Sequence, residues 1–267
     1  SFPDLVQGQD EVTNAFDDLK RQGIVVSEEY CEMRQQASQD ALEALIRENP
    51  VAGYFCFTED RMHDIRMTDA IPQRWVERPV ALRTKLNGDC RPGEFYTWQV
   101  GLFAPYQALS DVSVSFSDWK NEKGGRIPAA AFRCFNLGGI DTKGASFKKQ
   151  VNVDKGTVQA LWIGSDIPTD AIGVYKGTVV IRPAHAQPVK IHCELWVEGP
   201  VMTDKGDGEG WRKSRLRWLD SSIGNQPEPT YPYIPVKMDK RSISWLGGTM
   251  VLSNTGLPRS ISTHYDS

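Results

Sequence analysis

The sequence lacks a long apolar stretch: nowhere in its 267 residues does an apolar run reach the roughly 18 residues that a membrane-spanning helix needs. It also lacks an excess of positive charge, because 31 basic residues stand against 34 acidic ones and the formal charge is −3. Nonspecific binding to DNA or RNA is therefore not expected. Since no basic and then apolar leader follows Ser1, we expect a soluble chain from which any signal peptide has been removed.

Cysteine is scarce, with five residues that share no short repeated spacing. They are Cys31, Cys56, Cys90, Cys134 and Cys193. Three of them stand in apolar surroundings, where cysteine behaves as a small hydrophobic residue. The sequence therefore predicts neither a zinc site nor a disulfide framework. It allows one or two bridges at most and does not indicate a redox compartment.

The sequence also lacks the signatures of nucleotide binding and acyl transfer. It has no Walker loop, no Gly-x-Gly-x-x-Gly after a strand and no Gly-x-Ser-x-Gly elbow. No segment repeats itself at a period of about 20 to 50 residues. The four histidines are His63, His185, His192 and His264. None has a partner at the spacing of a helix or hairpin metal site, so we expect no metal and no cofactor.

What the sequence does contain begins with a helical extension over residues 1–77. Apolar residues at helical spacing predict a helix over residues 10–22 and a second over residues 27–49, for which a break near Ser38 is an alternative. Residues 51–57 then form an unbroken apolar run. Its length is that of a strand buried on both faces.

Strand periodicity replaces helical periodicity in residues 78–199. Over residues 189–197 the odd positions are apolar and the even ones polar or aromatic, so one face is core and the other meets solvent or a partner. The sequence of residues 159–182 predicts a strand, a turn and a second strand in unbroken order. Further strands are expected at residues 80–86, 95–104, 112–116, 132–137 and 158–164. The pattern predicts a mainly β chain built on an antiparallel β-sandwich of immunoglobulin or fibronectin type.

The last part of the chain, residues 200–267, is expected to hold a linker and a further C-terminal β segment. Residues 199–210 are rich in glycine and acid, a composition typical of a flexible connection, so we expect a domain boundary there. Strands are expected at residues 234–238, 242–246 and 249–252. They are barely enough for an independent sheet, and either pack on the sandwich or begin a second β-domain.

Two adjacent carboxylate pairs raise the question of general acid and base chemistry. Asp10 and Glu11 stand where a helix is expected to begin, where acids stabilise the helix dipole. Glu59 and Asp60 follow a predicted strand in a segment that also holds a base and a histidine. This pair either lines a site or forms an ion-pair cluster with Arg61 or Arg66.

Aromatic residues suggest two binding surfaces. The run at residues 211–218 is basic and has a tryptophan at each end, which could suggest contact with nucleic acid. Its acidic neighbours favour instead arginines that stack on tryptophans and pair with nearby acids. Trp196 shares the polar face of its strand with His192, so these two are the candidate sugar-binding residues. Burial of Trp196 against a neighbouring domain is the alternative.

Several strings resemble the N-terminal region of glycoside hydrolase family 123-like proteins, which are large multidomain bacterial proteins. The most specific is Arg-Leu-Arg-Trp-Leu-Asp-Ser at residues 215–221. The others lie at residues 53–61, 71–75, 91–103, 159–178 and 256–262. The resemblance covers most of residues 50–267. It implies a β-sandwich, then further β-structure, then a (β/α)8 catalytic barrel.

That family is similar to other enzymes that cleave N-acetylhexosaminides with the substrate's own acetamido group as nucleophile. Its catalytic Asp-Glu pair belongs on a barrel strand, and this chain has no alternating strand-helix region to build a barrel of about 250 residues. Asp10 and Glu11 do not match that setting, so we carry over no catalytic residue. The resemblance also implies an extracellular or periplasmic location.

The resemblance implies a function in glycan breakdown without catalysis by this chain. We expect the non-catalytic front portion of a longer glycoside hydrolase-like protein, packed against its own catalytic domain or a companion chain. One alternative is a carbohydrate-binding module that binds glycan through exposed aromatics. The other is a self-sufficient N-acetylhexosaminidase-type hydrolase.

Overall fold

The computed structural model describes residues 33–222, 225 and 228–263 of the chain. The helix expected at residues 10–22 and Cys31 lie outside the described residues. The chain divides into two compact units. The first comprises residues 1–141 and 146–221, and the second comprises residues 142–145 and 222–267. Each unit is described below by itself.

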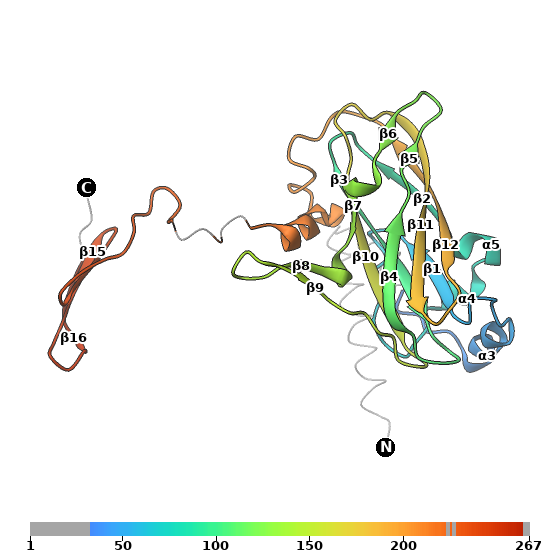
Figure 1. Cartoon of the computed structure of the whole chain (residues 1–267), viewed down its shortest axis with the longest axis horizontal. Coiled ribbons are helices and arrows are strands. Elements are labelled where there is room, and N and C mark those ends of the chain that lie inside the picture. The colour runs from blue at the N-terminus through green and yellow to red at the C-terminus, as the bar shows by residue number, and fades with distance from the viewer. Residues whose placement is uncertain (1–32, 223–224, 226–227, 264–267) are drawn as a thin grey trace, which may run out of the picture. The chain divides into compact units, whose positions relative to one another are not determined.

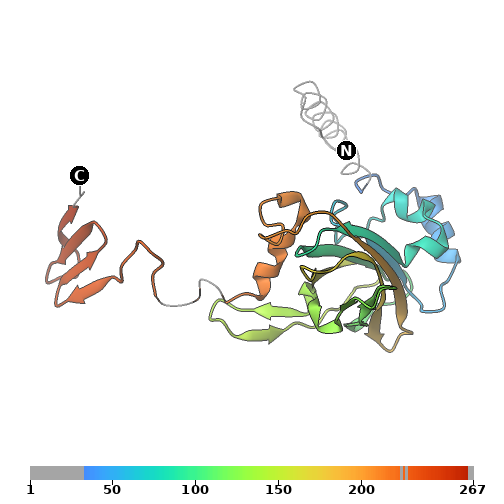
Figure 2. The same cartoon turned by 90° about the horizontal axis from the view of Figure 1, so that it is seen from above.

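The first unit is a sandwich of two β-sheets, as the sequence predicts (Figures 1 and 2). One sheet has the order β1-β3-β10-β7. Its strands are β1 (Phe55–Glu59), β3 (Phe95–Phe103), β10 (Val158–Asp166) and β7 (Phe132–Cys134). All of its pairings are antiparallel. We call it the first sheet.

The second sheet has the order β2-β12-β11-β5-β6, with β4 also paired to β11. Its strands are β2 (Lys85–Cys90), β12 (Val189–Val197), β11 (Gly173–Ala184), β5 (Trp119–Lys120), β6 (Arg126–Ile127) and β4 (Ser110–Phe116). Its pairings are antiparallel except β2 with β12. A separate hairpin joins β8 (Gly138–Ile140) to β9 (Ser146–Lys148), and two short 3-10 turns, η1 (Ala129–Ala131) and η2 (Phe135–Leu137), flank β7.

The core between the two sheets is large and aromatic. Trp98 of β3 and Trp119 of β5 are fully buried in it, together with Ile163 and Leu195 from the facing strands. On β12 the odd-numbered residues from Ile191 onward are buried, as the alternation of the sequence predicts. Burial of this much apolar surface is the main term that stabilises the sandwich.

The first sheet is buried on its outer side as well. A second apolar cluster there includes Phe57, Leu45 and Trp75, whose ring stacks on that of Phe57 at 4.5 Å between centroids. This cover comes from α3 (Gln39–Arg47) and α4 (Gln73–Glu77). Every residue of β1 and β3 is therefore buried. The strand predicted within residues 51–57 is confirmed as one buried on both faces, although β1 begins only at Phe55.

Local signals set the ends of the helices. Ser38 caps α3, because its Oγ accepts a hydrogen bond from the backbone N–H of Ala41 at 3.3 Å. Within the described residues, the helix expected at 27–49 is therefore confined to the part after its predicted break.

Two predicted strands differ from the structure. The strand expected at residues 80–86 was wrong in its first half, because α5 (Val80–Arg83) is a helical turn. Pro79 precedes this turn, and the guanidinium of Arg83 is held by Glu48. The strand expected at 132–137 was too long, because it ends at Cys134.

Residues 199–221 pack on the sandwich. Backbone bonds join Phe95 N–H to the Lys205 carbonyl at 3.0 Å and Met202 N–H to the Pro92 carbonyl at 2.8 Å. Asp204 accepts the N–H groups of Gly206 and Gly208, so glycine and aspartate here build a tight loop. Two 3-10 helices follow, η3 (Gly210–Arg212) and η4 (Ser214–Asp220). The sequence places a boundary at residue 199, whereas the first compact unit runs to residue 221.

A buried carboxylate holds this segment in place. Glu94 is 0% exposed. It accepts hydrogen bonds from the guanidinium groups of Arg61 and Arg212, and from the backbone N–H of Arg91 at 2.9 Å. Arg61 also lies between the rings of Tyr96 and Trp211, at 5.0 and 4.8 Å from their centroids. One side chain thus joins the end of β1, the turn before β3 and the segment after β12.

The second unit contains a four-stranded antiparallel meander. Its strands are β13 (Lys237–Asp239), β14 (Ser242–Trp245), β15 (Gly248–Leu252) and β16 (Pro258–Thr263). Met238 pairs with Ile243, Ile243 with Met250 and Met250 with Ile261. This register places one apolar row on one face of the sheet. The three strands expected in residues 234–252 are present, with shifted ends.

The substitution Glu94→Gln tests the buried carboxylate. Removing one partner from a buried charge cluster leaves the other charges uncompensated, so we expect the free energy of unfolding to fall by about 3 to 5 kcal/mol. Urea denaturation measures this change. The exposed Glu198 supplies the control, because Glu198→Gln should change stability by less than about 0.5 kcal/mol. Equal effects of the two substitutions would contradict the role of Glu94.

Candidate functional site

The two candidate sugar-binding residues lie on the outer face of the second sheet. His192 and Trp196 both belong to β12, and both side chains are exposed, that of Trp196 by 39%. Both side chains therefore lie on the polar face of β12, as the alternation of the sequence predicts. Four residues along a strand correspond to about 13 Å. The structure places the two on one face without bringing them into contact.

His192 lines a shallow hollow of about 330 Å³ on this face. We call it the polar hollow, because most of its lining residues have polar side chains. Its other lining residues are Lys85, Lys176, Gly177, Thr178, Cys193 and Glu194. Lys176 and Glu194 form an ion pair at 3.6 Å. The hollow offers ammonium, hydroxyl and imidazole groups to a ligand. Trp196 is not among its lining residues, so sugar binding by the pair stays a prediction.

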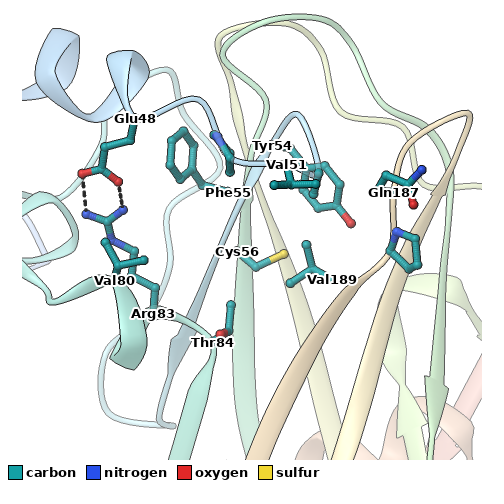
Figure 3. Close-up of a pocket in the computed structure, with 13 residues that line it drawn as sticks. Glu48, Val51, Tyr54, Phe55, Cys56, Val80, Arg83, Thr84, Gln187 and Val189 are labelled. Carbon is teal, nitrogen blue, oxygen red and sulfur yellow. Dashed lines mark hydrogen bonds and ion pairs between the residues drawn. The ribbon is translucent and has the colours of Figure 1, made fainter.

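A larger and mostly apolar hollow of about 700 Å³ lies near the start of β1 and β12 (Figure 3). We call it the apolar groove. Its thirteen lining residues are Glu48, Pro50, Val51, Ala52, Tyr54, Phe55, Cys56, Val80, Arg83, Thr84, Gln187, Pro188 and Val189. Val51 and Val80 are 96% and 66% exposed. Apolar side chains left in solvent around a hollow are typical of a surface that contacts another molecule.

The charged wall of the apolar groove is neutralised. Arg83 donates to both carboxylate oxygens of Glu48, and its guanidinium lies 5.9 and 5.7 Å from the ring centroids of Phe55 and Phe57. The Tyr54 hydroxyl donates to the Ile181 carbonyl at 3.2 Å. These polar groups are already paired within the chain. The groove therefore favours an apolar occupant over a charged one.

Glu59 is buried in an ion-pair cluster. Its carboxylate accepts hydrogen bonds from the indole N–H of Trp75 at 2.6 Å and from Arg78 at 2.5 Å. Arg74 lies at 3.6 Å from its other oxygen. The sequence suggested Arg61 or Arg66 as partners, but Arg61 binds Glu94 instead. The carboxylate of Glu59 fixes α4 against β1.

Asp60 caps the loop that follows β1. It accepts the N–H groups of Met62 and His63 and contacts the imidazole Nδ1 of His63 at 2.8 Å. The hydrogen bond to Asp60 raises the pKa of His63. Burial opposes ionisation of Asp60, but its bonds to His63 outweigh that effect and lower the pKa of the carboxyl. Glu59 and Asp60 thus have separate partners and separate structural roles.

In the aromatic and basic run at residues 211–218, arginines stack on tryptophans and pair with acids, as the sequence favours. Arg212 stacks on Trp211 at 4.3 Å and Arg215 on Trp218 at 5.6 Å. Arg217 pairs with Asp207. Arginines that stack on rings and pair with acids in this way stabilise the fold.

The remaining chemistry can be stated for the described residues alone. Cys56, Cys90, Cys134 and Cys193 are free thiols there. No group of three or more His, Cys, Asp or Glu side chains in that part of the chain could hold a metal ion. No helix among the described residues is long and apolar enough to cross a membrane.

Comparison with known proteins finds no matching family model and no matching curated protein. Solved structures that are similar to the chain include a family 123 glycoside hydrolase from Clostridium perfringens, with 16% identity and a TM-score of 0.43. That match covers 56% of this chain and 28% of the hydrolase.

Two other similar structures are a PapD-like domain and a periplasmic chaperone. A PapD-like domain of human CEP192 has 16% identity and a TM-score of 0.30, over 43% of this chain and 81% of that domain. The periplasmic chaperone SfaE has 12% identity and a TM-score of 0.26, over 68% of this chain and 95% of its own. At this level of likeness, nothing about the activity of this chain follows from these neighbours.

Sequence reasoning missed the apolar groove. Its residues come from three separate stretches, and Val51 was assigned to a buried strand together with Phe55 and Cys56. A weak signal was present, because Asn49-Pro50 ends the helix directly before an apolar residue and Pro79 stands directly before another. Such a signal shows a chain that turns, but not which side chains then face solvent.

The Asp60–His63 pair predicts a pH dependence of stability. Because the pKa of His63 is raised in the folded state, its contribution is complete below the unfolded value of about 6.5 and is lost as the pH rises through the folded value. Asp60 is partly exposed, so we expect a loss of at most about 1 kcal/mol. Urea unfolding between about pH 6 and pH 9 measures this loss.

The control is the exposed His192, which forms no such pair. His63→Gln should remove the fall in stability with pH, whereas His192→Gln should keep it. A wild-type stability that rises over this pH range, or a slope that survives in His63→Gln, would contradict the assignment.

Proposed function

We propose that this chain is a non-catalytic β-sandwich module of a glycan-degrading protein, and that it packs through the apolar groove against a catalytic domain. That domain belongs either to the same protein or to a companion chain. The proposal includes that the protein is located outside the cytoplasm, where polymeric glycans are degraded. It combines one observation on the structure with the resemblance of the sequence.

The observation that carries the proposal is the combination of volume and exposure in the apolar groove. A hollow of about 700 Å³ is bordered by Val51 and Val80, which are left in solvent, and its one buried cation is neutralised by Glu48. Burying an exposed valine contributes about 1.5 kcal/mol or more. Contact with an apolar surface of another domain would therefore be favourable.

The sequence indicates which kind of domain this is. The strings at residues 53–61, 91–103 and 215–221 resemble the front part of family 123-like glycoside hydrolases, in which a barrel follows the β-structure. Residues 53–61 include the groove residues Tyr54, Phe55 and Cys56. The resemblance and the apolar groove thus coincide on one stretch of the chain, which supports a packing role.

A photo-crosslinking amino acid placed at Val51 in the source cells tests the proposal. We expect a crosslink to a polypeptide that carries a glycosidase domain, identified by mass spectrometry, and its loss by at least about tenfold when Val80→Asp places a charge in the groove. The same crosslinker at the exposed Lys155 is the control for position. Crosslinks that reach only other proteins, or equally from both positions, would contradict the proposal, as would turnover of an N-acetylhexosaminide reporter by the chain alone.

A second candidate function is glycan binding on the outer face of the second sheet. The exposure of Trp196 favours it, because its ring lies on the same strand face as the polar hollow around His192. Exposed aromatic rings stack on the C–H faces of sugars, and the hollow supplies hydrogen-bonding groups. This function is compatible with packing through the apolar groove, since the two use different residues.

A further inference from the structure

The outer face of the second sheet carries an excess of positive charge. Its exposed cationic side chains are Lys85, Lys120, Lys176, Arg182 and Lys190. The acidic side chains on the same face are Asp89, Glu194 and the exposed Asp111 of β4. Asp118, beside β5, forms an ion pair with Arg126 of β6 at 2.7 Å. The chain as a whole has a formal charge of −3. We call this surface the basic face. Its net charge is positive, whereas that of the whole chain is negative.

Strand register gathers these cations into one area. Lys85 of β2 lies opposite His192, and Lys120 of β5 lies opposite Lys176. Lys190 is the next residue on the same side of β12 as His192. Given strand spacings of about 4.8 Å and a rise of about 3.3 Å per residue, the five cations fall within roughly 14 by 20 Å.

Most of this charge has no partner within the described chain. Lys176 is paired with Glu194 at 3.6 Å. Lys85, Lys120, Arg182 and Lys190 form no ion pair with any acidic side chain that the structure describes. Like charges directly opposite each other on neighbouring strands destabilise a sheet, as Lys120 and Lys176 must. A bound polyanion would compensate the four cations that form no ion pair in the described chain.

The polar hollow lies within the basic face and gives it a point of attachment. Its lining includes the ammonium-bearing side chains of Lys85 and Lys176 and the hydroxyl-bearing side chain of Thr178. A volume of about 330 Å³ is at the lower end of ligand-sized pockets. A carboxylate or sulfate group there would meet Lys85, the Thr178 hydroxyl and Lys176, whose charge is shared with the Glu194 carboxylate that also lines the hollow. Such charge-assisted hydrogen bonds are stronger than neutral ones.

We propose that the basic face binds an anionic polysaccharide, whose carboxylate or sulfate groups meet the lysines while a sugar ring stacks on Trp196. This inference rests on the second of the two proposed functions and names its ligand class. The separation of about 13 Å between His192 and Trp196 calls for an oligosaccharide that spans several sugar units. A single monosaccharide would reach the hollow or the ring, but not both.

The composition of the face favours a polysaccharide over nucleic acid. Single-stranded nucleic acid is held by several aromatic rings on which successive bases stack. Among the described residues of β2, β11 and β12, the outer face presents one such ring, Trp196. Its other uncharged positions are short side chains such as Thr178 and Val180. One ring with dispersed cations fits a sugar chain that carries regularly spaced charges.

The test measures binding of the full chain to four probes at low and moderate salt: polygalacturonate, heparin, neutral dextran and a short single-stranded DNA. We expect the tightest binding with polygalacturonate or heparin, and weaker binding as salt rises, because counterions are released from a polyanion. The double substitution Lys85→Gln with Lys190→Gln should weaken it roughly 3- to 20-fold. The matched control Lys155→Gln should change the Kd by less than about twofold.

The outcomes separate this inference from the function on which it rests. Binding to dextran that equals binding to both polyanions, is unaffected by the lysine substitutions and is lost in Trp196→Ala would overturn the anionic ligand class and leave glycan binding standing. No binding to any polysaccharide would overturn both. Tighter binding to DNA than to either polyanion would overturn the inference too. All substituted residues are exposed, and unchanged thermal unfolding would verify that the variants fold.

Discussion

One buried carboxylate joins three segments of the first unit. Glu94 is fully buried, and it accepts hydrogen bonds from Arg61 and Arg212 as well as from the backbone N–H of Arg91. Since a charge in the interior is tolerated only when it is paired, the end of β1 and the segment after β12 are held against the turn before β3. The glycine-rich stretch after β12 is consequently part of the fold. The apolar groove and the basic face are both set on the rigid body that results.

The two proposed surfaces differ because the two sheets are covered differently. Helices α3 and α4 bury the outer side of the first sheet, and the apolar groove lies where α3 and α5 meet the start of β1. The outer side of the second sheet stays in solvent, so its even-numbered β12 positions are polar or aromatic. One surface suits an apolar protein partner and the other a charged polymer. A module that both packs and binds could hold a catalytic domain close to its substrate.

The sequence could predict what depends on local periodicity. The alternation at 189–197 placed Trp196 and His192 on the outer face correctly. The break near Ser38, given as an alternative for the helix at 27–49, coincides with the cap of α3. Tertiary contacts were not predictable in the same way. Val80 lies in a helical turn whose last residue, Arg83, pairs with the distant Glu48. Glu94 has no sequence signal that distinguishes it from an exposed acid. The apolar groove combines three distant stretches. The basic face requires the register of four strands, which period-2 patterns do not fix.

The packing role is the central claim, and hydrogen–deuterium exchange tests it most directly. Backbone amides would be compared between this chain alone and the same chain joined to or mixed with the glycosidase domain that we propose as its partner. The account predicts slower exchange, by about tenfold or more, in residues 48–56, 80–84 and 187–189, and unchanged exchange in β12 beyond Ile191. Unchanged exchange around the apolar groove, with protection confined to the outer face of the second sheet, would contradict it.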